Sequence, residues 1–456
     1  MSRSTRTGRT VLISGAGIAG SALAHWLGRY GFEVTVVEVA PALREGGQAV
    51  DFRGDTHFTV LERTGVLDRL RAVGTGGSPM RFVDEGGSEL LHLPAEFAGG
   101  DLEVLRGDLV RVLYEHSLPC AAYRFGDSIT SLTDTGDEVR VTFRHAEPAA
   151  YDLVIGADGL HSNVRRLAFG PEERYVRHLG YYAATWSLPN HLGLVFGEGS
   201  VGLNAPGRLA SAGTDHRHPG RARAFFLFAA PEPGHARQDL HRQKALLAEA
   251  FAGLGWEVPR LLRSLEDAPE VYFDSISRAD VDSWSAGRIA LVGDAACGAT
   301  IGGMGTGTGM VAAHVLAGEL AADPDHRAAF ARYERLLRPY AERCQKGGDR
   351  TGPFLAPRTP WGLRTRNALL GRPRILHRMM EEGRRATNTM ALPDYRPAAP
   401  VPPTTCTTSA TPTMSVMPMA PMAPTMSATP DTPAMPDAAR AAPATPAMRP
   451  SGPRSA

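Results

Sequence analysis

The sequence contains few cysteines, and they are far apart. Only four occur in 456 residues, with no CxxC pair and no cluster with histidine at metal-ligand spacing. Disulfide frameworks and zinc sites depend on such patterns. We therefore predict neither a disulfide-stapled fold nor a metal centre. The four residues are Cys120, Cys297, Cys344 and Cys406.

The chain also lacks an excess of charge and a long apolar run. Its 49 basic and 48 acidic residues give a net charge of +1, which provides no broad positive field for nucleic acid or anionic lipid. The basic start MSRSTRTGRT is followed by apolar residues that glycines, His25 and Arg29 interrupt. This pattern is typical of neither a secretory signal nor a membrane span, so we expect a cytoplasmic protein.

The C-terminal part lacks aromatic side chains. After Pro397 nearly every residue is Pro, Ala, Thr, Met or Ser, and such a segment cannot bury enough apolar surface to offset its conformational entropy. We predict that residues 397–456 are disordered and solubilising, with no catalytic role. The whole chain has 43% hydrophobic and 21% charged residues, as in soluble globular proteins. The part before the tail is long enough for two folded domains.

A strand, a glycine turn, a helix and a second strand open the chain. Arg9 to Ser14 (RTVLIS) and Glu33 to Glu38 (EVTVVE) are short apolar runs of strand type, and the residues between them have helical periodicity. This βαβ unit predicts a parallel sheet and an α/β fold. Further strands are expected at 80–83, 88–92, 122–125, 138–144 and 151–156, several of them paired through turns with Gly or Asp, so that small antiparallel pieces decorate that sheet.

The pattern changes after about Tyr175. Strand-like stretches separated by Gly, Pro and Asn predict a second, mostly antiparallel β-sheet domain, before glycine-rich α/β sequence returns at Gly287 to Gly309. The first domain is therefore expected to be discontinuous and Rossmann-like. The predicted division is a flexible start (1–9), a first domain in two parts (10–174 and 281–345), the second domain (175–280), a helical region (346–396) and the tail (397–456).

The turn after the first strand has the pattern GxGxxG. The first glycine permits a tight turn, the second allows a pyrophosphate to approach the backbone, and the third allows close packing of the helix. The helix N-terminus then faces the phosphates. The residues of this turn are Gly15, Ala16, Gly17, Ile18, Ala19 and Gly20.

An acidic residue ends the next strand. The carboxylate of Glu38 can accept hydrogen bonds from a ribose diol, and its charge would repel a ribose 2′-phosphate. The pair of motifs therefore favours FAD or NAD over NADP at this site.

Two later strands also end in an aspartate and a glycine. DLVIGADGLHSN carries Asp158 and Gly159, and because Asp-Gly is a common turn dipeptide, the residues favour a turn and helix cap over a nucleotide contact. RIALVGDA ends in Gly293 and Asp294 and precedes the loop GGMGTGTG and an apolar helix. Asp294 can bind a ribityl or ribose hydroxyl, and the loop can bring backbone N–H groups to an anionic ring.

The order GAGIAG, Glu38, GADG and LVGDAA with GGMGTG resembles the class A flavin-dependent monooxygenases of the para-hydroxybenzoate hydroxylase fold, over about Thr10 to Tyr395. The resemblance implies one tightly held FAD, a visiting NADPH or NADH, and a substrate domain above the flavin. Arg106 in LRGDL matches the arginine beside the flavin. The cofactor-binding residues that the motifs and the resemblance imply are Gly15 to Gly20, Glu38, Arg44, Arg106, Asp158, Gly293, Asp294, Gly303, Met304 and Gly305.

The same resemblance implies the reaction. NADPH or NADH reduces FAD, dioxygen forms a flavin C4a-hydroperoxide, and an aromatic or polyketide-like small molecule is hydroxylated. A flavin-dependent dehydrogenase, reductase or halogenase of this fold, and a flavin-bound regulatory protein without turnover, remain alternatives. The segment CGATI departs from the family, which commonly has an aromatic residue or histidine and prolines there, so the flavin contacts of this loop are open.

The catalytic residues and the substrate pocket are not identified by sequence. A reactive role for Cys297 is not favoured, since no basic residue lies near it in the sequence. We expect a monomer or homodimer without nucleic-acid partners. By analogy with the family, Arg53 is placed near the flavin or substrate. Pocket candidates, none of them preferred, are His178, Tyr181, Tyr182, Trp186 and Asn204.

Overall fold

The computed structural model describes residues 8–43, 48–195, 197–215, 218, 220–231, 239–300, 304–388 and 390–395. Its central element is a six-stranded sheet whose strands run parallel except for β17 at one edge. The order is β17 (Ser285–Ala286), β18 (Ile289–Leu291), β11 (Leu153–Gly156), β1 (Thr10–Ser14), β2 (Glu33–Glu38) and β7 (Ala121–Phe125). Strands far apart in the chain, such as β1 with β11 and β11 with β18, therefore lie side by side, and the α/β fold is confirmed.

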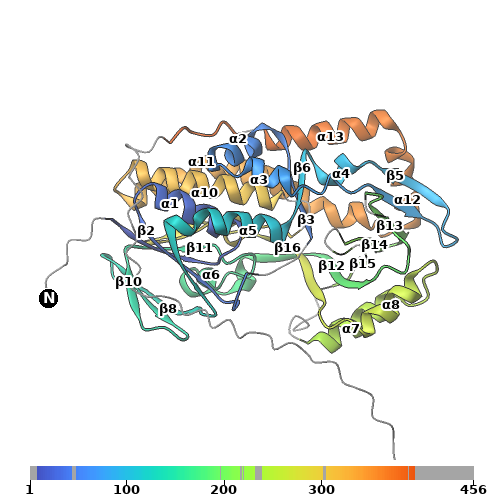
Figure 1. Ribbon diagram of the computed structural model, residues 1–456, viewed down its shortest axis with the longest axis horizontal. Helices are drawn as coiled ribbons and strands as arrows, with labels where there is room; N and C mark the ends of the chain where they lie inside the picture. The colour runs from blue at the N-terminus through green and yellow to red at the C-terminus, as the bar shows by residue number, and fades with distance from the viewer. Residues whose placement is uncertain are drawn as a thin grey trace, which may run out of the picture. The chain divides into compact units, whose positions relative to one another are not determined.

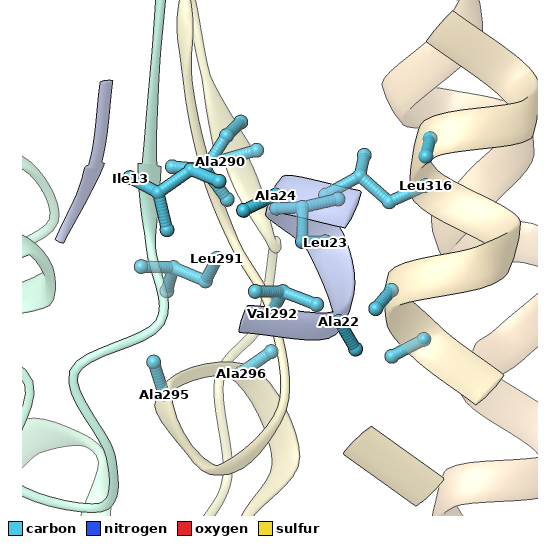
Figure 2. Close-up of a cluster of buried hydrophobic side chains, with 14 of the residues drawn as sticks. Ile13, Ala22, Leu23, Ala24, Ala290, Leu291, Val292, Ala295, Ala296 and Leu316 are labelled. Carbon is cyan, nitrogen blue, oxygen red and sulfur yellow. The ribbon is translucent and has the colours of Figure 1, made fainter. Parts of the chain in front are cut away.

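Helices cover this sheet and join its strands (Figure 1). α1 (Ile18–Arg29) connects β1 to β2 as the sequence predicts, and it packs between the sheet and α10 (Gly305–Ala322). Figure 2 shows why the approach is close: Ala22 and Ala24 of α1 lie among Ile13, Ala290 and Leu316, so small side chains fill the space between the layers. The other helices of this part are α2 (Gly54–Thr64), α3 (Leu67–Ala72), α5 (Arg106–Ser117), α6 (Asn163–Ala168), α9 (Asp294–Cys297) and α11 (His326–Leu355).

The second large sheet has seven strands and is mostly antiparallel. Its order is β16 (Tyr272–Ala279), β12 (Val176–Pro189), β15 (Arg221–Ala229), β14 (Arg208–Thr214), β13 (Ser200–Ala205), β4 (Met80–Val83) and β5 (Glu89–Leu93). One face packs on a core with α7 (Leu240–Phe251) and α8 (Val258–Glu266). α12 (Pro360–Leu370) and α13 (Pro373–Thr387) follow α11 at the far end of the chain.

Two sequence-based placements of strands are wrong. β4 and β5 do not extend the parallel sheet, because β4 pairs in parallel with β13 and so joins the second sheet. β7 is not an antiparallel addition, because it pairs in parallel with β2. In both cases the partner lies far away in the chain, so the local turn signals could not identify it.

Two small sheets complete the fold. β8 (Ile129–Asp134), β9 (Val139–Phe143) and β10 (Ala149–Tyr151) form an antiparallel three-stranded sheet. β3 (Ala49–Phe52) and β6 (Leu102–Leu105) form a two-stranded ribbon, near the short helix α4 (Ala95–Gly99). Among the described residues, no helix is long and apolar enough to cross a membrane and no group of acidic, histidine or cysteine side chains could hold a metal ion.

Candidate functional site

Two glycines of the first turn are required by the packing of the protein itself. Gly15 has φ = +108°, and a Cβ there would lie 2.5 Å from the carbonyl oxygen of Ala157. A Cβ at Gly20 would lie 1.9 Å from the carbonyl oxygen of Gly15. Both distances are shorter than van der Waals contact, so a side chain at either position would displace backbone.

Gly17 differs from its two neighbours. It precedes the first residue of α1 with φ = −79°, a value open to any residue, and no atom of the described chain lies within 4 Å of where its Cβ would be. This open space lies at the N-terminus of a helix, where backbone N–H groups favour an anion. The turn therefore fits the pyrophosphate of a dinucleotide.

Glu38 stands at the end of β2 with its carboxylate turned back to the turn. One oxygen accepts the N–H of Ala16 at 2.9 Å, and the other accepts the N–H of Ala40 at 2.9 Å. Each carboxylate oxygen has a second lone pair, so both can still accept a hydroxyl hydrogen. The half-buried side chain thus keeps the acceptor lone pairs that a ribose diol would need.

Asp158 makes its hydrogen bonds within the protein. Its carboxylate accepts the hydroxyl of Ser14 at 3.3 Å, the N–H of Val164 at 2.9 Å and the hydroxyl of Ser162. Burial raises the pKa of this carboxyl group, against the effect of these hydrogen bonds. The turn-and-cap interpretation describes this geometry, in which Asp158 joins the end of β1 to the start of α6.

Sequence reasoning missed Arg165, which links this turn to the later aspartate loop. Its side chain is 0% exposed, and its guanidinium donates to the carbonyl oxygen of Ala295 at 2.9 Å and to that of Leu160. A buried arginine requires such acceptors, because an unpaired buried charge is costly. The sequence offered one signal for this residue: Arg165 lies near the start of α6, shortly after the Asp158 turn.

Asp294 begins α9 and lies close to the N-terminal turn. A Cβ at Gly293 would lie 2.8 Å from the Cβ of Ala19 in α1, and one at Gly305 would lie 3.1 Å from Oδ1 of Asp294. The two motifs, far apart in the chain, therefore meet as the sequence predicts.

Asp294 combines exposure to solvent with a raised carboxyl pKa. The side chain is exposed to solvent, yet the protein crowded around it raises the pKa of its carboxyl, an effect that the charge of Arg106 opposes. A group that is both accessible and desolvated by nearby protein is placed for a ligand. Arg106 is exposed at the first position of α5, and its charge acts on Asp294.

The remaining predicted residues fall into two groups. Met304 takes a left-handed conformation with φ = +53° at the N-cap of α10, and Ile18 and Ala19 are half-buried at the start of α1. Arg44 and Gly303 lie outside the described residues.

Two other residues discussed in the sequence analysis, Cys297 and Arg53, interact with the protein itself. Cys297 is buried, and burial raises the pKa of its thiol, so the structure does not favour a reactive thiolate. The guanidinium of Arg53 pairs with Asp51 and donates to the carbonyl oxygen of Phe97 at 2.9 Å.

A cavity of about 490 Å³ lies against the seven-stranded sheet. Its floor is one face of the sheet, where the register aligns Met80, Ser200, Gly213, Arg223 and Ser187 in a row across five strands. The opposite wall comes from the β3–β6 ribbon, through Gln48, Ala49 and Leu105. Leu105 directly precedes Arg106 in the chain, so Arg106 follows a residue that lines the cavity.

Charged side chains gather at the β14–β15 turn, which also lines the cavity. Arg223 lies 3.7 Å from a carboxylate oxygen of Asp215, and Nε of Arg221 donates to the hydroxyl of Ser187 at 2.8 Å. His218 lies 3.6 Å from the other oxygen of Asp215. The remaining lining residues are Ser78, Thr185, Ser211, Thr214 and Phe225.

None of the pocket candidates named from the sequence lines this cavity. Trp186 and Tyr182 belong to the core under α7 and α8, and Tyr181 packs in the core near the end of α11. His178 bonds to the carbonyl oxygen of Ala230, and Asn204 bonds to Arg366. Strand alternation was the missed signal, because Thr185 and Ser187 face opposite to Trp186.

Comparisons with known proteins identify the family. The FAD binding domain matches residues 9–177. Uncharacterized protein Rv1260 of Mycobacterium tuberculosis (strain ATCC 25618 / H37Rv) is 44% identical over 346 residues, which cover 74% of this chain and 92% of that protein. A flavin-dependent monooxygenase from an unknown prokaryotic organism is 40% identical over 347 residues, covering 75% of this chain and 88% of the relative.

A solved structure agrees with these relatives. The crystal structure of tetracycline destructase Tet(55) superposes with a TM-score of 0.74 and 36% identity, covering 85% of this chain and 99% of that one. The chain therefore belongs to the flavin-dependent monooxygenases, and its cofactor is FAD.

Proposed function

We propose that this monooxygenase uses NADPH or NADH and dioxygen to hydroxylate an aromatic or polycyclic small molecule. The observation that carries the proposal is the cavity beside Arg106. Its volume of about 490 Å³ lies in the usual range for pockets that enclose a small organic molecule. Met80, Leu105 and Phe225 supply apolar contact for rings, while the polar row of the sheet supplies hydrogen bonds.

The same proposal assigns the cofactor residues. Gly15, Gly17 and Gly20 form the pyrophosphate turn, Glu38 binds the adenosine ribose, and Asp294 binds the ribityl chain. Met304, Gly305 and Arg106 would contact the flavin ring system when FAD is bound. When bound, FAD supplies the redox chemistry with nicotinamide and dioxygen.

In this proposal the protein orients the substrate and excludes water. The β3–β6 ribbon and the seven-stranded sheet would enclose the substrate in the cavity and hold it in one orientation. The substrate's polar groups meet the side chains around Arg221 and Arg223 at the β14–β15 turn. Residues 175–280 then form most of a substrate domain, to which β4 and β5 contribute two strands.

The location and assembly are also proposed. Scattered cysteines and the need for NADPH or NADH support a cytoplasmic enzyme, working as a monomer or homodimer. Two alternatives share the fold: a flavin-dependent dehydrogenase, reductase or halogenase, and a flavin-bound regulatory protein. Oxygen consumption matched to hydroxylated product separates the first from a monooxygenase, and reduction by NADPH separates the second.

The test starts from purified protein with its flavin. We expect an absorption band of bound flavin and an NADPH oxidation rate that rises with a polycyclic phenol; tetracycline belongs in the first panel because structural relatives carry its name. Mass spectrometry should find a product heavier by one oxygen atom. Protein that holds flavin and is reduced by NADPH, but consumes no oxygen with any compound of the panel, would contradict the proposal.

A further inference from the structure

His57 is a buried histidine whose ring contacts Gly307 in the first turn of α10. It lies on α2 with 0% exposure, and its ring fills the place where a side chain of Gly307 would stand. A Cβ at Gly307 would lie 2.1 Å from Cε1 and 2.2 Å from Nε2 of His57. The first turn of α10 therefore rests directly on the imidazole ring.

The protonation of this ring is fixed by its partners. The backbone N–H of Arg53 lies 3.1 Å from Nδ1, and because an N–H can only donate, Nδ1 is the acceptor. The hydrogen of the neutral ring is then on Nε2, which lies 2.8 Å from the hydroxyl of Tyr340. Burial lowers the pKa of His57 to about 4, so the ring is neutral at pH 7.

The hydroxyl of Tyr340 anchors the ring to a different helix. Tyr340 belongs to α11, is 2% exposed, and burial raises the pKa of its phenol, so it keeps its proton. Phe52 stands edge-on to His57 with ring centroids 6.2 Å apart. The imidazole is thus held between β3, α2 and α11, with its edge against α10.

The supported turn lies beside Asp294, which the proposed function places at the FAD site. Gly305, at the start of the same helical turn, stands next to Oδ1 of Asp294. The free N–H groups of a first helical turn carry partial positive charge and stabilise nearby negative charge. Reduced flavin carries more negative charge than oxidised flavin. The position of this turn therefore affects the two redox states differently.

We propose that His57 and Tyr340 are positioning residues that hold the first turn of α10 against the flavin and thereby raise its reduction potential. The inference concerns the FAD site alone and does not depend on the choice of substrate. It predicts that loosening the support weakens binding of the reduced cofactor more than binding of the oxidised cofactor.

The experiment measures the midpoint potential of bound FAD by equilibration with a reference dye, together with the visible spectrum and the melting temperature. Tyr340→Phe removes one oxygen atom and His57→Ala removes the ring. For each we expect the affinity for reduced relative to oxidised FAD to fall by about tenfold, which lowers a two-electron potential by about 30 mV. His57→Gln, which keeps a side-chain N–H donor, should recover part of this shift.

Tyr181→Phe is the matched control. Like Tyr340, Tyr181 is a buried phenol; its hydroxyl donates to the carbonyl oxygen of Ala356 at 3.1 Å, and, as His57 does on Gly307, its ring packs on a helical glycine, Gly352. We expect a similar loss of melting temperature and an unchanged potential. Wild-type potential and spectrum in both Tyr340→Phe and His57→Ala would show that the pair is ordinary core packing and would overturn the proposal.

Discussion

The proposed FAD site is built mainly from backbone groups, whereas the proposed substrate cavity is built from side chains. The FAD site uses backbone: glycines without side chains, helix N-termini and strand ends, as at Gly17 and Gly305. The cavity uses side chains on one face of a sheet, such as Ser187 and Arg223. A backbone site requires certain residues at fixed spacing, whereas a sheet face accepts many side chains. The first therefore leaves a motif in the sequence and the second does not.

The largest expected effect compares the two faces of β12. Trp186 is 2% exposed and packs on Phe226, so Trp186→Ala should lower the free energy of unfolding by about 3–5 kcal/mol. Ser187→Phe, one residue away on the cavity face, should change it by no more than about 0.5 kcal/mol, as for a surface site. Denaturant unfolding measures both.

The variants Trp186→Ala and Ser187→Phe also distinguish a loss of stability from a loss of substrate binding. Ser187→Phe should keep its FAD, while its substrate-stimulated NADPH oxidation falls because the added ring occupies the cavity. If Ser187→Phe lost stability as Trp186→Ala does, the assignment of the two faces would be wrong.

The next effect compares two glycines of one turn. In Gly20→Ala the new Cβ would meet the carbonyl oxygen of Gly15, and such overpacking costs about 1–3 kcal/mol even without FAD. In Gly17→Ala no atom of the described chain meets the new Cβ, so the stability of the apoprotein should be unchanged. FAD affinity should still fall by at least about tenfold, or about 1.4 kcal/mol.

Melting curves of the apoprotein and titration with FAD distinguish these outcomes. Gly17→Ala with wild-type FAD affinity would mean that the open space above Gly17 does not hold the cofactor.

The last comparison concerns the loss of stability in acid. His25, His57 and His314 lie on α1, α2 and α10 around the six-stranded sheet, and burial lowers their pKa values to about 3, 4 and 4. Below pH 6.5 the unfolded chain takes up protons that these folded histidines do not. Stability is therefore lost as pH falls from 6.5 towards 4, by at most about 1.4 kcal/mol per pH unit for each histidine.

His25→Phe tests this sign. Both ring nitrogens of His25 are buried without a hydrogen-bond partner among the described residues, so a ring of similar size without nitrogen should fit. Urea unfolding of the variant and the wild type at pH 7 and pH 5 should show a smaller loss in the variant. Equal losses would contradict the prediction.

The sequence predicted the parts of the fold that depend on local pattern. Glu33–Glu38 is a strand with the predicted bounds, and the turns of Gly15 and Asp294 meet as expected. Pairing between distant segments was not predictable in this way. The union of β4 with β13, the bridge from Arg165 to Ala295 and the contact of His57 with Gly307 join residues more than a hundred positions apart. Such contacts depend on the whole topology, not on a window of sequence.

The end of the described chain has a consequence for how the protein is made. Arg63 donates to the carbonyl oxygen of Pro393 at 2.7 Å, and the hydroxyl of Tyr30 donates to that of Tyr395 at 3.1 Å, across 365 positions. The ring of Tyr395 lies on Gly318 of α10. During synthesis α1 is translated early, and its contact with Tyr395 can form only after the end of the described chain has been made. Almost four hundred residues must therefore be synthesised before Tyr395 can contact both Tyr30, at the end of α1, and Gly318 of α10.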